Sequence, residues 1–476
     1  MKSFKQLLFI SLISIFVLSC SKEGGNPDTT TESNTKELTI FHINDQHGRL
    51  ENFAKIKYII DQEKLTTTVM VVCGGDIFSG NPVVDNHDEK GFPMIDLMNK
   101  VGFDVSVIGN HEFDYGETIL KDRFLQSQFE WVCANVDMNN TEIPQPNEYK
   151  TIVKGDLRIT FLGLIETNGK DYDIIPSTHP WRVKNLTFQK YQDVILNYAQ
   201  VKENEQSDLL VALTHLGESV DYNIANNYPF FDLIIGGHSH TTVNTSVNNI
   251  PVFQAGSNLN YLGKIKLIIK DAKVESFTHD LIDLSSYANY DVAISNTVAT
   301  FNTNSSLDDV IGYASVYHSR ASVGSFYTEA LRNEMDVDIS FQNTGGVRND
   351  LNEGDITKRE IYSIDPFNNG SVTYTMTVQE IKNFLIGSKL GIYYSGVIIE
   401  QDGNTIDISN MNKQLLDDNT DLTVGVNDYI PAVYDMYFTQ TPSNKPFTTA
   451  ETIINYLSHQ SDPIDYTAIN SYFKFQ

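Results

Sequence analysis

The chain has 476 residues, with 61 acidic against 34 basic side chains and a formal net charge of −27 at pH 7. This length, with an apolar content of 41%, is sufficient for more than one domain with a substantial core. The negative charge excludes a protein that coats nucleic acid, because such a protein needs a basic face. Acidity of this kind usually reflects a solvated surface, and we assign it no catalytic role.

The first twenty residues have the pattern of an export signal. Lys2 and Lys5 give a positive start, and Leu7 to Leu18 is apolar but too short to span a bilayer comfortably. The stretch ends in Leu-Ser-Cys and resembles a bacterial lipobox, with lipid on Cys20; ordinary signal cleavage is the alternative. Residues 21–36 are polar, which predicts a flexible tether. We therefore expect an exported lipoprotein, anchored to a membrane and periplasmic or at the cell surface.

From residue 37 onward, apolar runs alternate with helical patterns, as is typical of an α/β domain. Five of these runs end in Asp, Asn or His. The polar residues that end them are Asp45 and His47, Asp76, Asn110 with His111 and Asp114, His215, and His238 with His240. Polar side chains at the carboxyl ends of strands in one domain can converge on one site. Five unrelated polar loops are the alternative, and the repetition of the pattern argues against it.

The chemistry of these side chains favours a metal site. Carboxylate and amide oxygens mixed with imidazole nitrogens suit a divalent metal such as zinc, manganese or iron. A lone histidine such as His111 is more often a hydrogen-bonded loop residue, so the prediction rests on the whole set.

The ordered set Asp-x-His, Gly-Gly-Asp, Gly-Asn-His-Glu-Phe-Asp, Thr-His and Gly-Gly-His-Ser-His resembles the calcineurin-like metallophosphoesterase superfamily. Its first three motifs are similar to the 5′-nucleotidase branch, which includes UDP-sugar hydrolases and 2′,3′-cyclic-nucleotide phosphodiesterases. The resemblance covers about residues 37–263. It implies an α/β (α+β) protein: a four-layer sandwich of two mixed sheets flanked by helices, followed by a smaller mixed α/β substrate-binding domain.

The resemblance also implies roles at the first site. It implies two divalent metal ions, of manganese, zinc or iron, and a bridging role for Asp76 between them. The implied metal ligands are Asp45, His47, Asp76, Asn110, His215, His238 and His240. Such a pair of metals would polarise the phosphoryl oxygens and convert a bridging water into the attacking hydroxide. His111 would stabilise the transferring phosphoryl group, and Asp114 would favour the cationic form of its ring.

Motifs in the second half extend the resemblance. Residues 343–348 are similar to the Asn-x-Gly-Gly-[Ile/Val]-Arg motif of the family, and residues 354–369 to its Gly-x-[Ile/Val]-Thr…Pro-Phe-x-Asn pattern. The implied substrate-binding residues are Asn343, Arg348, Phe367, Tyr429 and Asp435. A guanidinium suits phosphate, two aromatic rings can stack on any base, and the carboxylate would bind ribose. Core packing is the alternative for the two aromatic residues, and a surface ion pair for the arginine.

Two positions depart from the family pattern. Tyr317 stands where the family has an arginine aimed at the phosphate. Arg320, one helical turn later, is a candidate replacement, and loss of this charge is the alternative. Residues 431–435 replace a Gly-Gly-Asp, which changes the freedom of the loop and puts Tyr434 near the base or sugar site.

The expected partner is a small nucleotide or other phosphate ester, with no nucleic-acid polymer. A 5′-nucleotidase acting on nucleoside 5′-monophosphates is the leading prediction. The alternatives are a hydrolase of cyclic nucleotides, UDP-sugars or another ester, and an inactive lipid-anchored binding protein.

The predicted organisation has five parts. They are the signal peptide (1–20), the tether (21–36), the catalytic metallophosphoesterase domain (37–295), a linker (296–310) and the substrate-binding domain (311–476). The linker is poor in apolar residues, and we expect a helix over Leu307–Tyr317, or its continuation through Ala330 and Leu331, to lead into the second domain.

Overall fold

The computed structural model describes residues 35–303, 305–469 and 471–476. The predicted signal peptide and nearly all of the tether lie outside the described residues. The last two residues of the tether, Thr35 and Lys36, open strand β1 (Thr35–Ile43). Within the described part of the chain, no helix is both long and apolar enough to cross a membrane.

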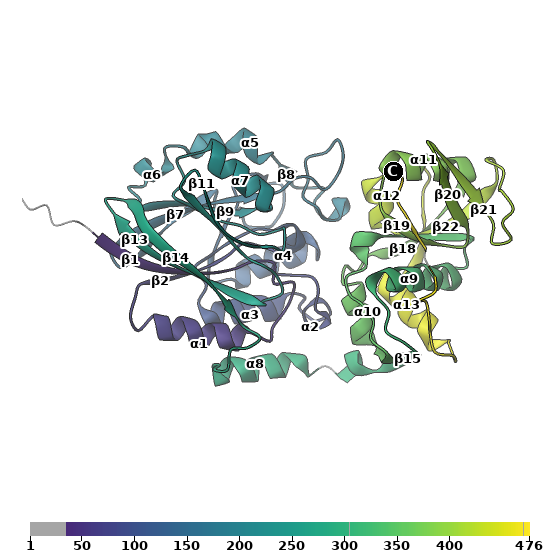
Figure 1. Cartoon of the computed structure of the whole chain (residues 1–476), viewed down its shortest axis with the longest axis horizontal. Helices are drawn as coiled ribbons and strands as arrows, with labels where there is room; N and C mark the ends of the chain where they lie inside the picture. The colour runs from purple at the N-terminus through teal and green to yellow at the C-terminus, as the bar shows by residue number, and fades with distance from the viewer. Residues whose placement is uncertain (1–34, 304, 470) are drawn as a thin grey trace, which may run out of the picture. The chain divides into compact units, whose positions relative to one another are not determined.

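Two six-stranded sheets form the catalytic domain (Figure 1). The first has the order β14-β13-β1-β2-β3-β4 and the second the order β11-β12-β10-β9-β7-β6. The strands of the first sheet are β1, β2 (Val69–Cys73), β3 (Val105–Val107), β4 (Glu130–Val132), β13 (Tyr261–Lys270) and β14 (Lys273–Asp283). Those of the second are β6 (Tyr149–Lys154), β7 (Leu157–Ile165), β9 (Leu209–His215), β10 (Leu233–Ile235), β11 (Thr242–Val247) and β12 (Ile250–Ala255). Strands β1 to β4 run parallel, as do β7, β9, β10 and β12, so their carboxyl ends share one edge of each sheet.

Apolar layers explain why the two sheets stack. Ile40, Val72 and Leu213 are fully buried in the core between them. On the outer face of the first sheet lie α1 (Phe53–Glu63) and α3 (Phe92–Val101), and α7 (Glu218–Asn227) packs on the second (Figure 1). Strands buried on both faces read as continuous apolar runs, which is the pattern seen in the sequence. The four-layer sandwich confirms the predicted fold class.

The second domain has its own six-stranded sheet, of order β23-β18-β22-β16-β19-β24. Its strands are β16 (Ile339–Asn343), β18 (Gly370–Thr377), β19 (Ile392–Ser395), β22 (Asp421–Asn427), β23 (Ser443–Thr448) and β24 (Tyr472–Phe473). The longer helices are α9 (Arg320–Met335), α11 (Val378–Ser388) and α13 (Thr449–Ser458). This smaller mixed domain also agrees with the prediction.

The helix predicted over Leu307–Tyr317 is wrong. Residues Val310–Ala314 form strand β15, which pairs with β17 (Gly354–Thr357). The helix begins at Arg320 and includes Ala330 and Leu331, as the alternative predicted. The stretch is rich in β-branched and aromatic side chains, and a partner strand distant in sequence decides its conformation. The first part of the predicted linker is also ordered, because α8 (Val292–Asn302) runs through it.

Candidate active site

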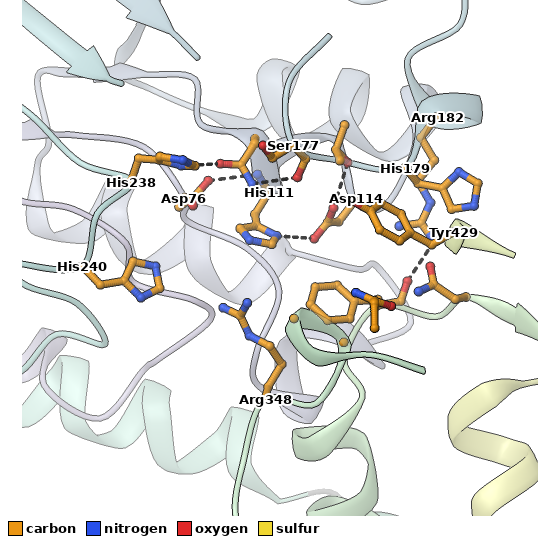
Figure 2. Close-up of a pocket in the computed structure, with 17 residues that line it drawn as sticks. Asp76, His111, Asp114, Ser177, His179, Arg182, His238, His240, Arg348 and Tyr429 are labelled. Carbon is orange, nitrogen blue, oxygen red and sulfur yellow. Dashed lines mark hydrogen bonds and ion pairs between the residues drawn. The ribbon is translucent and has the colours of Figure 1, made fainter. Parts of the chain in front are cut away.

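The five polar strand tips meet at one centre. Potential ligand atoms of Asp45, His47, Asp76 and His240 lie within 4.8 Å of one another, and so do those of Asp76, His215 and His238. Asp76 belongs to both groups, so its carboxylate can reach two ions. Figure 2 shows Asp76, His238 and His240 on one side of a pocket.

The ring of His215 directs its Nε2 at this centre. Its Nδ1 lies 2.7 Å from the carbonyl of Gly74, which can only accept, so Nδ1 carries the proton of the neutral ring. The Nε2 lone pair then faces Oδ2 of Asp76 at 3.0 Å and Oδ1 of Asn110 at 3.2 Å. A ring nitrogen and two oxygen acceptors that face one another need a cation between them, either a proton on Nε2 or a metal ion, so the donor set fits a divalent metal.

A second histidine repeats the arrangement. Nδ1 of His47 lies 3.0 Å from the carbonyl of Ser79, and its Nε2 lies 2.9 Å from Nε2 of His240. Two imidazole nitrogens at this separation can share one metal ion as neighbouring ligands. Burial lowers the pKa of His47 well below its ordinary value and that of His240 to about 4, so both rings are neutral, as ligands must be.

The amide of Asn110 is held in the orientation that a ligand needs. Its Nδ2 donates to the carbonyl of Ser177 at 3.0 Å. Oδ1 is therefore turned toward His215 and toward Nδ1 of His238, which lies 3.0 Å away.

The carboxylates and the histidines control one another's protonation. Burial alone would raise the pKa of Asp76, but His215 and His111 hold it well below its usual range. Burial alone would lower the pKa of His215, but Asp76 raises it to about 10. Burial raises the pKa of Asp45 to about 7. The raised pKa values of Asp45 and His215 mean that these side chains bind protons strongly. A divalent cation competes with the protons for the same lone pairs, so the centre also attracts metal.

Backbone conformation marks the same residues. Asp45, His47, Asp76, His238 and His240 have φ values of 52°, 48°, 56°, 79° and 57°. Non-glycine residues rarely adopt this left-handed region, and those that do cluster at functional sites. The five residues aim their side chains from tight turns that directly follow strands.

Beside the centre lies the pair formed by His111 and Asp114. Nδ1 of His111 is 2.6 Å from Oδ2 of Asp114. Burial alone would lower the pKa of His111, but Asp114 and Asp76 raise it above its ordinary value. Burial would raise the pKa of Asp114, and His111 lowers it. The ring is therefore poised as a cation whose Nε2 can donate a proton or a hydrogen bond.

Glu112 is a residue of this site for which the sequence suggested no role. Its fully buried carboxylate accepts from the backbone N–H groups of Asp76 at 3.0 Å, Ile77 at 2.5 Å and Gly109 at 2.5 Å. It therefore fixes the turn that carries the shared carboxylate of Asp76.

A pocket of about 320 Å³ opens next to the metal-ligand centre (Figure 2). The predicted residues that line it are Asp76, Asn110, His111, Asp114, His238, His240, Asn343, Arg348, Phe367 and Tyr429. The guanidinium carbon of Arg348 lies 5.5 Å from the centroid of the Phe367 ring, an attractive cation–π placement. That ring stacks on His111 with centroids 6.0 Å apart.

Seven further residues line the pocket: Ser177, Thr178, His179 and Arg182, which the sequence reasoning missed, and Gly345, Gly346 and Asn369, which it placed in motifs without a role. The first four come from one segment that follows β7. No strand-tip motif marks it, and its partners in the site, among them Asn110, Asp114 and Tyr429, are distant in sequence. The adjacent polar residues of the stretch Ser177-Thr178-His179 are the one signal that the sequence offered.

Two predicted substrate residues lie apart from the described lining of the pocket. The guanidinium of Arg320 donates through Nε and Nη2 to the carbonyl of Val347, at 3.1 and 2.7 Å. The carboxylate of Asp435 pairs with Lys170 at 2.9 Å. Tyr434 packs against Phe384 of the domain core, with centroids 6.0 Å apart.

Fold and site together define a calcineurin-like phosphoesterase, a hydrolase of phosphoric ester bonds that holds two metal ions. Comparison with known families agrees. The calcineurin-like phosphoesterase family matches residues 38–242, and the 5′-nucleotidase C-terminal domain matches residues 298–440. The chain therefore belongs to the 5′-nucleotidase family of these enzymes.

Similar proteins have related names. The 5′-nucleotidase of Vibrio cholerae is 25% identical over 90% of this chain and 92% of its own. The trifunctional nucleotide phosphoesterase protein YfkN of Bacillus subtilis is 26% identical over 76% of this chain, but the match spans only 28% of that protein. The match to endonuclease YhcR of the same bacterium spans 32% of that protein. The crystal structure of a 5′-nucleotidase precursor from Thermus thermophilus shares the fold, with a TM-score of 0.77, 20% identity and coverage of 89% of this chain and 96% of that one.

Proposed function

We propose that the protein is an exported 5′-nucleotidase, which hydrolyses nucleoside 5′-monophosphates to nucleoside and phosphate. The observation that carries the proposal is one pocket with two chemically different ends. Asp76 and His238 lie at one end and Tyr429 at the other (Figure 2), and the ring of Phe367 stacks on that of His111. A phosphate monoester with an aromatic base fits both. The name of the Vibrio cholerae relative supports the same substrate class.

At the phosphate end, seven residues would hold the two ions: Asp45, His47, Asp76, Asn110, His215, His238 and His240. When bound, the ions supply Lewis acidity and an activated water nucleophile. His111 is held as a cation by Asp114 and donates from Nε2 to a phosphoryl oxygen as charge moves onto the leaving group. Figure 2 shows the guanidinium of Arg348 pointing into the same space, where it binds phosphate oxygens.

At the other end, Phe367 and Tyr429 supply the aromatic surfaces for the base. Stacking tolerates every base because each has a π-face, so the pocket selects nucleotides as a class. Asn343 lies on the same lining and offers an amide to the sugar or phosphate.

A hydrolase of cyclic nucleotides, UDP-sugars or another ester is the second candidate. It is favoured by the positions of Arg320 and Asp435, which are engaged with Val347 and Lys170 instead of facing the pocket.

Phosphate release tests the choice between the two candidates. The protein that lacks residues 1–34 is assayed in the presence of manganese, zinc or cobalt. The substrates are AMP, UMP, 2′,3′-cyclic AMP, UDP-glucose and bis-p-nitrophenyl phosphate. Strong preference for the 5′-monophosphates is the expected result, and activity on the diester alone would refute the nucleotidase. In parallel, His111→Ala should retain both metals and lose about 10²- to 10⁴-fold in turnover. Normal turnover by this variant would remove His111 from the mechanism.

Export as a lipoprotein is part of the proposal and rests on residues 1–20. Labelled palmitate should be incorporated into the full-length protein in bacterial cells and should disappear in Cys20→Ala. Equal labelling of both proteins would contradict the assignment of Cys20.

A further inference from the structure

One segment of the catalytic domain, Ser177–Arg182, touches both ends of the pocket. It ends in the short helix η2 (Pro180–Arg182), and four of its six residues line the pocket. The roles given above to the metal ligands and the motif residues do not explain what this segment does.

Its first two residues hold the reacting end. The carbonyl of Ser177 accepts from the side-chain amide of Asn110 at 3.0 Å. The hydroxyl of Thr178 donates to Oδ1 of Asp114 at 3.0 Å, while Oδ2 of that carboxylate is 2.6 Å from His111. Thr178 is 3% exposed and Asp114 5% exposed, so water cannot easily replace this bond. Both oxygens of Asp114 are thus engaged, which fixes the plane of the carboxylate and with it the ring of His111.

Its last residues hold the aromatic end. Nη2 of Arg182 donates to the carbonyl of Phe367 at 2.8 Å. The ring of His179 meets the ring of Tyr429 edge to face, with centroids 6.1 Å apart. The segment therefore contacts the ring of Tyr429 and the main chain of Phe367, the two residues proposed to hold the base.

The segment itself is anchored. Glu166, which is 2% exposed, accepts from the backbone N–H of Ser177 at 2.5 Å and from that of Asn168 at 2.7 Å. Only three residues separate Thr178 from Arg182, and the turn of η2 shortens that span. Displacement of one end is therefore transmitted to the other.

We propose that Ser177–Arg182 is a positioning element, which sets the distance between the His111–Asp114 pair and the aromatic surfaces. Thr178 is a positioning residue for phosphoryl transfer, because it acts through Asp114. Arg182 determines specificity for esters whose leaving group carries a base, because it fixes the Phe367 main chain. The Arg182 part rests on the proposed nucleotidase function, whereas the Thr178 part requires only phosphate-ester hydrolysis.

Thr178→Val tests the reacting end, because it keeps the shape of the side chain and removes the hydroxyl. Turnover should fall about tenfold or more on both AMP and ribose 5-phosphate, with KM within about twofold and metal content unchanged, because small misplacements of catalytic groups are costly. Thr178→Ser should restore turnover. Thr187→Val, at an exposed threonine of β8 (Thr187–Phe188), is the matched control and should behave as wild type.

A second readout does not depend on activity. The proton of the His111 Nδ1–H···Asp114 bond gives a downfield NMR signal, which should shift in Thr178→Val and stay in place in Thr187→Val and Thr178→Ser. Wild-type turnover with an unshifted signal in Thr178→Val would overturn the proposal. Loss of metal or of folded protein in Thr178→Val would also overturn it, since that result means a structural role.

Arg182→Ala tests the aromatic end, with the exposed neighbour Lys184→Ala as the control. The ratio of kcat/KM for AMP to that for ribose 5-phosphate should fall at least fivefold in Arg182→Ala only. An unchanged ratio would overturn the role of Arg182. If the wild type showed no preference for AMP over ribose 5-phosphate, the proposed nucleotidase function would fail. The role of Thr178 would still be tested, because wild type and Thr178→Val can be compared on whichever ester the enzyme cleaves.

Discussion

Glu112→Ala should destabilise the metal-ligand centre through the backbone turn that carries Asp76. The carboxylate accepts from three backbone N–H groups, those of Asp76, Ile77 and Gly109, and all three residues are enclosed in the fold. A buried donor left without an acceptor costs about 1–3 kcal/mol. Three such donors, after partial relaxation, should lower the free energy of unfolding by about 3–6 kcal/mol. The turn that carries Asp76 should loosen, and metal affinity should fall with it.

Urea unfolding and isothermal titration with manganese provide the assay. Burial raises the pKa of Glu112 to about 7, so the measurement is made at pH 8, where the wild-type carboxylate is ionised. Glu112→Gln should lose less than Glu112→Ala, because one oxygen still accepts. Glu142→Ala, which removes only an exposed ion pair with Lys121, is the control and should match wild type. A loss below about 1 kcal/mol in Glu112→Ala, with metal affinity intact, would refute the reasoning.

Three further predictions concern the ions, the base and pH. Asp76→Ala should reduce the metal content to one ion or none per chain by elemental analysis, because Asp76 belongs to both ligand groups; two retained ions would contradict the shared role. Phe367→Ala should raise KM for AMP by about tenfold or more, since stacking contributes about 1–3 kcal/mol per base, and an unchanged KM would remove Phe367 from the base site. Burial raises the pKa of Asp85 from its ordinary 3.8 to about 7, so the folded state binds the proton more tightly and the free energy of unfolding should fall as pH rises from about 4 to 7. The share of Asp85 in this change, at most about 4 kcal/mol, should be missing in Asp85→Asn, whereas other buried carboxyl groups such as Asp45 still contribute. Identical urea profiles of the two proteins across that range would contradict the prediction.

The metal-ligand centre was accessible from sequence because it depends on strands. Asp45, Asp76, Asn110 and His215 each follow or end a buried parallel strand, and parallel strands deliver their carboxyl ends to one edge. The grouping of these side chains therefore follows from local patterns together with one topological rule.

The rest of the pocket depends on contacts that residue types do not encode. Arg182 and Arg320 are both arginines beside turns, and each donates to a main-chain carbonyl, one to Phe367 and the other to Val347. Only the folded chain shows that Arg182 lines the pocket. The strand at Val310–Ala314 was missed for a similar reason, since its partner lies more than forty residues away at Gly354–Thr357.

The left-handed backbone at the ligand positions has a consequence for how such a centre persists through mutation. Each non-glycine residue held in this region costs about 1–2 kcal/mol, so five of them cost an amount comparable with the whole stability of a typical domain. Random substitution under selection for folding alone would favour glycine there. The chain nevertheless carries two carboxylates and three imidazoles at these positions. An inactive descendant would be expected to lose them early, so their presence argues that the chemistry of the centre is still in use.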